Sequence, residues 1–304
     1  MTENVIKDKV AGNVGLMVST SIWATMFPVT ESLLQTWDPI AITAGRLTGG
    51  AIILLTALAL TGNFGRAITN VPWGKLILLG IVGVSISTLA LAYGIKHSGA
   101  VESALIATTS PILATLLVYL FYSEPLRKGI VGGVLLAVAG GICTVFADGQ
   151  GLEGFQGGEL FILAALSMWI WYSYNCQRWL RGIPQLGIAA LTVAAGALVL
   201  DIWIALAELM KLTNVSFDTS SNQLILVGYL ALGPASFSLF LWHFGVSRIG
   251  ITVASMYGNL VPIVVVLIAV AFGRYPTVLH LIGGALIISG VLYAQLRNLK
   301  GAAV

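Results

Sequence analysis

The residues of this sequence that could bind a ligand are aromatic and hydroxyl side chains set inside long apolar stretches. Trp23, Trp169 and Trp242 lie well within such stretches, where the indole N–H lacks the water that normally satisfies it. Rings that line a cavity can stack on an apolar or aromatic ligand, and their faces attract an ammonium group. Helix packing is the alternative role, and the sequence leaves both roles open.

Polar residues near two prolines, Pro111 and Pro262, extend this set. A proline inside a helix frees a backbone carbonyl, so a kinked turn there suits a ligand's ammonium or carboxylate group. The competing interpretation is that the hydroxyls bond back to their own helix. The candidate substrate-binding residues are Trp23, Ser85, Tyr93, Thr109, Ser110, Trp169, Trp171, Ser238, Trp242, His243, Tyr257 and Asn259.

Three charged or histidine residues also lie well inside apolar stretches, away from their ends: Arg46, Asp201 and His243. Such residues usually face protein or water. Arg46 either pairs or snorkels within the structure or faces a ligand, and His243 either packs or contacts a ligand. The three form no visible proton relay, so substrate exchange or facilitated movement down a gradient fits at least as well as proton antiport.

Catalytic and metal-binding motifs are missing from the sequence. It has no His-Glu-x-x-His zinc motif, no phosphate-binding glycine loop with lysine and no paired intramembrane aspartates. Channel filter motifs are missing too. Cys143 and Cys176 lie in or at the end of apolar runs and support no disulfide framework. We therefore expect no enzyme activity, cofactor or metal; a membrane enzyme and a channel are the weaker alternatives.

The composition indicates that membrane-spanning helices hold these residues in place. Of the 304 residues, 58% are hydrophobic and only 9% are charged, against about 25% charged in a soluble domain. Most of the surface must therefore face a lipid bilayer, and the net charge of +3 implies no nucleic-acid partner. A spanning helix needs about 20 mainly apolar residues. Ten runs qualify: Val14–Leu34, Ile40–Leu60, Trp73–Ile95, Val101–Tyr122, Gly129–Ala147, Glu159–Trp179, Leu186–Leu209, Leu224–Val246, Thr252–Phe272 and Val278–Leu296.

Basic residues between these runs fall mainly on one side of the membrane. Of the 15 Lys and Arg residues, 11 lie on the side of the N-terminus and three on the other side, and Arg46 lies inside a run. Because cytoplasmic loops are enriched in Lys and Arg, we expect both termini in the cytoplasm.

The sequence repeats itself. A shift of 151 residues aligns Pro111 with Pro262 and gives eight identities in the 31 positions from Pro111 to Gly141, among them a second proline and a double glycine. Each half then holds five runs, and because five is odd, the second half must enter the membrane inverted. Inverted repeats are typical of secondary transporters. The predicted fold is an all-α membrane protein of ten transmembrane helices in two inverted five-helix repeats, residues 1–148 and 149–304.

The order of several motifs resembles the drug/metabolite transporter superfamily, of the ten-span EamA type. These motifs are Trp23, Arg46, residues 96–100 (Lys-His-Ser-Gly-Ala), Pro111 and residues 124–126 (Glu-Pro-Leu), followed in the second half by Trp242, residues 247–250 (Ser-Arg-Ile-Gly), Pro262 and Gly283-Gly284. Tyr275 replaces the acidic residue that is common in the family after the ninth span. Residues 23–26 and 99–102 are most similar to the bacterial aromatic-amino-acid exporter.

This resemblance implies a secondary transporter in the cell's inner (plasma) membrane that exports amino acids, aromatic ones and related small metabolites among them. Other substrates, such as a nucleotide sugar or a drug, are the alternative within transport. The spacing of Gly129 and Gly133 allows close helix approach. We therefore expect the fifth and tenth spans to pack on each other or on a partner subunit, which makes a homodimer a candidate assembly.

Overall fold

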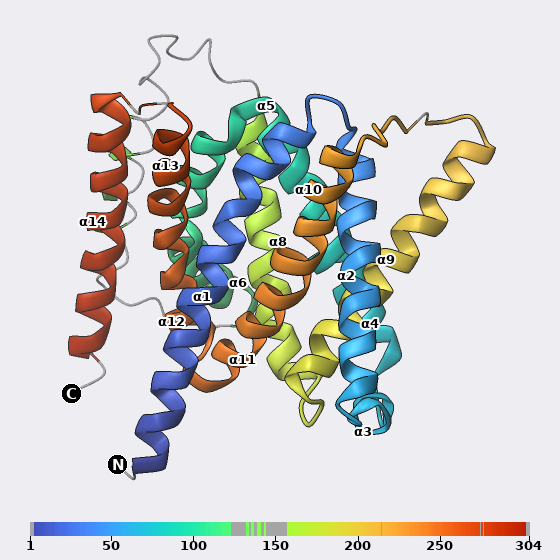
Figure 1. The fold of residues 1–304 in the computed structure, drawn as a ribbon. Coiled ribbons are helices and arrows are strands. Elements are labelled where there is room, and N and C mark those ends of the chain that lie inside the picture. The colour runs from blue at the N-terminus through green and yellow to red at the C-terminus, as the bar shows by residue number, and fades with distance from the viewer. Residues whose placement is uncertain are drawn as a thin grey trace.

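The computed structural model describes residues 3–122, 132–133, 135–136, 139–140, 143, 157–213, 215–273, 275 and 277–301. All regular elements within these ranges are helices (Figure 1). They are α1 (Glu3–Leu33), α2 (Pro39–Leu60), α3 (Phe64–Ile68), α4 (Trp73–Leu78), η1 (Leu79–Ile86), α5 (Ser87–Ala107), α6 (Ser110–Tyr122), α8 (Gly158–Trp179), α9 (Gln185–Leu209), α10 (Ser221–Leu232), η3 (Gly233–Ser238), α11 (Leu239–Ile249), α12 (Ile251–Ala254), η4 (Ser255–Asn259), α13 (Leu260–Ala271) and α14 (Val278–Gly301).

Five helical segments within the described ranges are long and apolar enough to cross a membrane. They are Lys7–Leu33, Pro39–Leu60, Trp73–Ala107, Gln185–Leu209 and Ser221–Ile249, and Ser110–Tyr122 and Leu281–Gly290 are shorter apolar helices. The predicted run Gly129–Ala147 lies mostly outside the described residues. The helix α8, predicted as a span, is less apolar because it packs on α5, α6 and η1 inside the bundle.

Glycine bends the backbone in the same way at two places, inside α5 and directly after α11. Gly99 has φ 75° and ψ 170°, and Gly250 has φ 79° and ψ 159°. Only glycine adopts this backbone region readily. The two residues are 151 positions apart, so the third and fourth predicted spans join through the same bend as the eighth and ninth.

Two π-helical stretches, η1 and η3, also occupy corresponding positions. The Ser85 hydroxyl donates to the Gly80 carbonyl at 3.3 Å, and the Ser236 hydroxyl donates to the Ala231 carbonyl at 2.6 Å, in each case five residues back along the chain. Each serine also reaches the opposite half: Ser85 donates to Gly196 of α9 at 2.7 Å, and Ser236 donates to Gly50 of α2 at 3.3 Å. Such π-turns are often found at functional sites.

Helix packing repeats between the halves as well. The helix α8 packs on α5 and α6, while α1 packs on α11 and α13. The helices α2 and α9 pack directly on each other. Gly132 lies against Tyr293 of α14, where a Cβ at Gly132 would come within 2.7 Å of the ring. The first helices of both halves, α1 and α8, therefore lie in the middle of the bundle (Figure 1).

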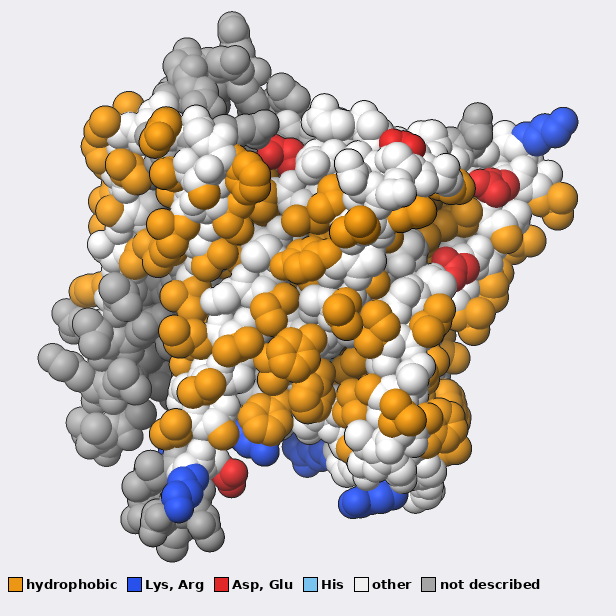
Figure 2. Space-filling view, in the orientation of Figure 1, with side chains coloured by type: hydrophobic (Ala, Val, Ile, Leu, Met, Phe, Trp, Pro, Cys, Tyr) orange, Lys and Arg blue, Asp and Glu red, His pale blue; other side chains and the backbone are white. Residues whose placement is uncertain are grey.

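Apolar side chains cover the middle of the molecule on the face that Figure 2 shows. On this face, Lys and Arg gather at the end where the N-terminus lies, apart from one at the tip of α9, and Asp and Glu lie mainly toward the opposite end, apart from one beside the N-terminus (Figure 2). Core contacts are dense: Phe27, Ile42 and Tyr172 are fully buried. The bundle thus surrounds its centre with packed helices and exposes an apolar belt.

Candidate functional site

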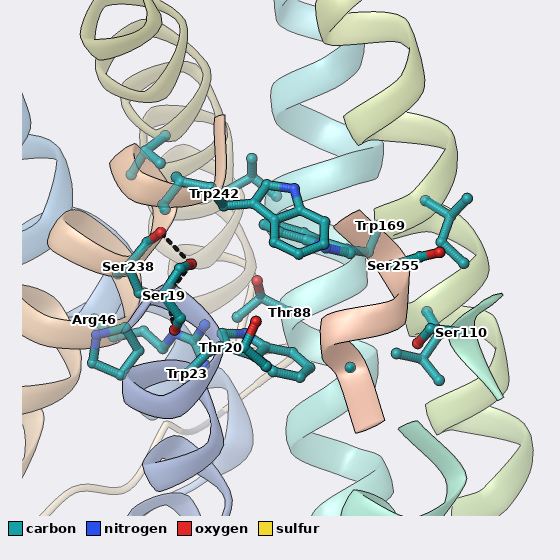
Figure 3. Close-up of a pocket in the computed structure, with 18 of the residues that line it drawn as sticks. Ser19, Thr20, Trp23, Arg46, Thr88, Ser110, Trp169, Ser238, Trp242 and Ser255 are labelled. Atoms are coloured by element: carbon teal, nitrogen blue, oxygen red, sulfur yellow. Dashed lines mark hydrogen bonds between the residues drawn. The ribbon is translucent and has the colours of Figure 1, made fainter. Parts of the chain in front are cut away.

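A cavity of about 70 Å³, measured as the volume open to water centres, lies at the centre of the bundle (Figure 3). One water molecule needs about 10–15 Å³ on this measure, so the space holds several. Helices from both halves line it. Its polar and aromatic lining consists of Ser19, Thr20, Trp23, Arg46, Thr88, Ser110, Trp169, Ser238, Trp242 and Ser255.

Five of the twelve candidate residues from the sequence line this cavity. They are Trp23, Ser110, Trp169, Ser238 and Trp242. They come from α1, α6, α8, η3 and α11. The fold thus brings together side chains that are up to 219 residues apart in the chain.

Aromatic rings form one wall of the cavity. The Trp169 and Trp242 ring centroids are 6.0 Å apart with planes tilted by 46°, and Trp169 also lies 5.3 Å from Tyr172. The indole N–H of Trp242 donates to the Ser173 hydroxyl at 3.0 Å, which fixes the ring. Trp23 sits edge-to-face on the buried Phe27, with centroids 5.2 Å apart. All three tryptophans are half-buried and offer ring surface to the cavity.

Hydroxyl groups on α1 and η3 hold another part of the lining together. The Ser19 hydroxyl donates to the Ser238 carbonyl at 2.7 Å, and the Ser238 hydroxyl donates to the Ser19 carbonyl at 2.8 Å (Figure 3). At the next residue of α1, no hydrogen-bond partner for the buried Thr20 hydroxyl occurs among the described residues. Thr88 of α5 adds a further hydroxyl to the lining.

Arg46 is the only charged side chain among the described residues that line the cavity. It is 7% exposed, which excludes snorkelling to the membrane surface. Its Nη1 donates to the Met26 sulfur at 2.8 Å, a weak acceptor. Its Nε finds no partner within the part of the chain that the structure describes.

The remaining candidates lie elsewhere. Ser85 joins η1 to α9, as described above, and Thr109 bonds back to the Ile106 carbonyl at 2.7 Å. Tyr93 stacks on Phe161 with ring centroids 5.9 Å apart, and Trp171 packs edge-on against Trp179 at 5.6 Å. The side chain of Asn259 lies outside the described residues.

Two candidates take part in hydrogen bonds next to the cavity. The fully buried His243 Nε2 lies 2.9 Å from the Tyr172 hydroxyl, which lies 2.8 Å from the Thr192 hydroxyl. The Tyr257 hydroxyl donates to the Asn13 side-chain oxygen at 2.6 Å and so ties η4 to the N-terminal half of α1.

Sequence reasoning left Ser19, Thr20, Thr88 and Ser255 out of the candidate set, and it kept the role of Arg46 open. The repeat could have pointed to some of them. Trp23 and Trp169, and likewise Leu47 and Val193, are 146 residues apart, and both members of each pair line the cavity. Thr88 and Leu239 are 151 residues apart and do the same. A residue that lines the cavity in one half therefore indicates that the corresponding residue of the other half lines it too.

The comparison with known families decides what kind of protein this is. A model of the EamA-like transporter family matches residues 10–146 and matches again at residues 156–295. The chain belongs to the EamA-like transporter family. It is therefore a membrane transporter, and the apolar helices cross the bilayer.

Relatives of this EamA-like transporter match along most of its length. The uncharacterized transporter YdfC of Bacillus subtilis is 26% identical over 93% of this chain and 92% of its own. A probable terminal-alkyne amino-acid exporter of Streptantibioticus cattleyicolor is 26% identical over 93% of both chains. The uncharacterized inner membrane transporter YedA of Escherichia coli is 25% identical over 83% of this chain and 79% of its own. A crystal structure at 22% identity shares the fold, with a TM-score of 0.73 over 95% of this chain and 98% of that one.

A wider cavity of about 870 Å³ lies in the transporter toward the C-terminal end of α1. Its lining includes Glu31, Glu102 and Tyr275 together with the Gly99 bend. The Glu31 carboxylate accepts from the Ala100 backbone N–H at 3.0 Å, which caps the helical turn after the bend. We call this space the vestibule.

Loops beside α2 and α10 are joined in the transporter by Asp38. Its carboxylate accepts from the Ser216 backbone N–H at 2.9 Å and from the Ser216 hydroxyl at 2.7 Å. These bonds, the backbone one most, lower the pKa of Asp38 below its ordinary value of 3.8. Trp37 reinforces the contact by donating to the Asp218 carbonyl at 2.9 Å.

Proposed function

We propose that this transporter exports amino acids, aromatic ones and related small metabolites among them, by alternating access or exchange. The observation that carries the proposal is the central cavity, in which Trp23, Trp169 and Trp242 surround a space whose described lining has one charged group, Arg46. Aromatic walls with a few polar groups suit an amphipathic ligand with an apolar body.

The named relative supports the same class. The Streptantibioticus cattleyicolor protein is called a probable terminal-alkyne amino-acid exporter. At 26% identity, that name supports amino-acid export here without fixing the side chain.

The architecture behind alternating access is also a proposal. We propose ten spans in two inverted repeats, residues 1–148 and 149–304. The double family match, the corresponding bends at Gly99 and Gly250, and the matching Ser85 and Ser236 bonds support two equivalent halves. The vestibule lies toward one end of α1, while Tyr257–Asn13 ties the other half of α1 to η4. If the two halves exchanged these two arrangements, the cavity would open to the other side of the membrane.

Orientation and assembly complete the proposal. Both termini lie in the cytoplasm and the protein resides in the inner membrane, as the basic residues on the N-terminal side and the name of the relative YedA support. A homodimer remains a prediction from the small-residue spacing in the fifth span.

Countertransport in proteoliposomes tests the function. Vesicles preloaded with unlabelled L-phenylalanine should take up labelled L-phenylalanine saturably, and L-leucine should compete better than glycine. Saturable uptake of a nucleotide sugar without any response to amino acids would overturn the substrate class. Uptake that does not saturate and shows no countertransport would contradict a transporter mechanism of this kind.

A further inference from the structure

We propose that Arg46 and Thr20 form a carboxylate-binding subsite in the central cavity. The molecules that this transporter moves would then carry a carboxylate at the end opposite their apolar body. The inference rests on the proposed function and deepens it by naming the group that the substrate must present.

The first observation is a buried cation without a counter-ion. No carboxylate of a described residue forms an ion pair with Arg46, and the cavity lining within the described ranges contains no Asp, Glu or Lys. Asp201, an acidic residue of α9, accepts from Thr48 at 2.7 Å and lines a different pocket, next to Trp37. An unpaired charge in a low-dielectric interior is strongly unfavourable. A bound anion would supply the missing partner.

The second observation is independent of charge. The Thr20 hydroxyl is 4% exposed, lines the same cavity and has no partner among the described residues. Buried hydroxyls are nearly always hydrogen-bonded, so an orphan is a place where a ligand or water belongs. A hydroxyl that donates and a guanidinium with a free Nε both suit the two oxygens of a carboxylate.

The arrangement of the cavity gives the substrate a direction. In Figure 3, Arg46 and Ser19 lie on the side of α1 and α2, and Trp169, Ser255 and Ser110 lie on the opposite side. Trp242 shares the aromatic wall with Trp169. A carboxylate at Arg46 therefore places the rest of a small ligand against tryptophan rings.

Three probes with the same phenyl body separate the contributions: 3-phenylpropionate carries the carboxylate alone, phenethylamine the amine alone and L-phenylalanine both. Their affinities are measured by thermal-shift titration of the purified full chain. The wild type should bind both carboxylates about ten-fold or more tightly than phenethylamine, the scale of one hydrogen bond to a charged group. Arg46→Met should remove that preference without weakening the binding of phenethylamine, and Arg46→Lys should keep most of it.

Thr20 provides a milder variant with a matched control. Thr20→Val should weaken binding of both carboxylates by about 2- to 10-fold, the scale of a neutral hydrogen bond. Thr30→Val is the control because Thr30 lies on the same helix, is 1% exposed and also lacks a partner among the described residues, yet does not line the cavity. It should leave all three affinities unchanged.

A structural role for Arg46 gives a different result. Because no ion pair is lost, unliganded Arg46→Met should unfold at the same temperature as the wild type or at a higher one. A wild type that binds 3-phenylpropionate no better than phenethylamine, or an unchanged preference in both Arg46→Met and Thr20→Val, overturns the subsite. If Arg46→Met does not fold, the Thr20 and Thr30 variants decide.

The outcome also separates the subsite from the proposed function. If 3-phenylpropionate binding depends on Arg46 but L-phenylalanine shows no countertransport, amino-acid export is wrong and the subsite stands. If L-phenylalanine is transported while neither variant changes the preference for carboxylates, the export proposal stands and the subsite is wrong.

Discussion

Truncating Trp169 to alanine should change which amino acids the transporter prefers. The ring lies 6.0 Å from Trp242 and 5.3 Å from Tyr172, and it lines the cavity. An aromatic pair contributes about 0.5–1.5 kcal/mol beyond burial of area. Losing one such contact with the substrate should raise the KM for an aromatic amino acid about 2- to 13-fold more than the KM for a small one.

The assay is initial-rate countertransport of L-phenylalanine and L-alanine, normalised to the amount of protein in the vesicles. Trp169→Ala also removes two ring contacts within the protein, so a general loss of activity through folding must be subtracted. Trp73→Ala is the control for that loss because Trp73 is 51% exposed on the surface and does not line the cavity. Equal losses for both substrates in Trp169→Ala would refute the stacking role and leave packing alone.

Three further predictions concern stability and use thermal or chemical unfolding of the purified protein. Gly250→Ala should destabilise the protein by about 1–3 kcal/mol, because a φ of 79° is unfavourable for alanine although the added Cβ has open space. Gly228→Ala is the control: its Cβ has equal space inside α10, and it should stabilise the protein by up to about 1 kcal/mol. Equal effects of the two substitutions would contradict the argument from backbone strain at Gly250. Tyr172→Phe should cost about 1–3 kcal/mol by leaving His243 Nε2 unpaired; a loss no larger than that of Tyr93→Phe, whose ring stacks on Phe161, would argue against this bond. The pKa of Asp38 in the folded state is lowered below 3.8, so its bonds to Ser216 stabilise the fold fully above pH 3.8 and are lost as the pH falls through the lowered pKa. Asp38→Asn should therefore flatten the dependence of stability on pH between about pH 2 and 5. An unchanged pH dependence in this variant would count against a stabilising role of the Asp38 carboxylate.

Apolar runs located most helices because lipid-facing sequence is constrained at every position. The predicted run Leu186–Leu209 and the helix α9 (Gln185–Leu209) nearly coincide. The start of α1 was missed: it begins at Glu3 rather than Val14, because polar residues can extend a helix beyond the bilayer without any apolar signal. The π-turns at η1 and η3 were also missed, since they arise from packing of Ser85 and Ser236 against the opposite half rather than from local composition.

The site shows the same limit. Tryptophan bulk inside a span indicated Trp23, Trp169, Trp171 and Trp242, and of these all but Trp171 line the cavity. Hydroxyl residues were not separable in this way, because a serine that faces a cavity and one that bonds to a neighbouring helix look alike in sequence. Thr20 is a hydroxyl residue that faces the cavity, and Ser85 is one that bonds to a neighbouring helix. The isolation of Arg46 from every described carboxylate became visible only once the helices were placed.

We propose above all that substrates bind among Trp23, Trp169, Trp242 and Arg46. A structure determined with bound L-tryptophan tests it most directly. We predict the indole against Trp169 and Trp242, with the carboxylate within hydrogen-bond distance of Arg46. L-Tryptophan bound instead in the vestibule beside Glu31 and Glu102, with the central cavity unchanged, would contradict the claim.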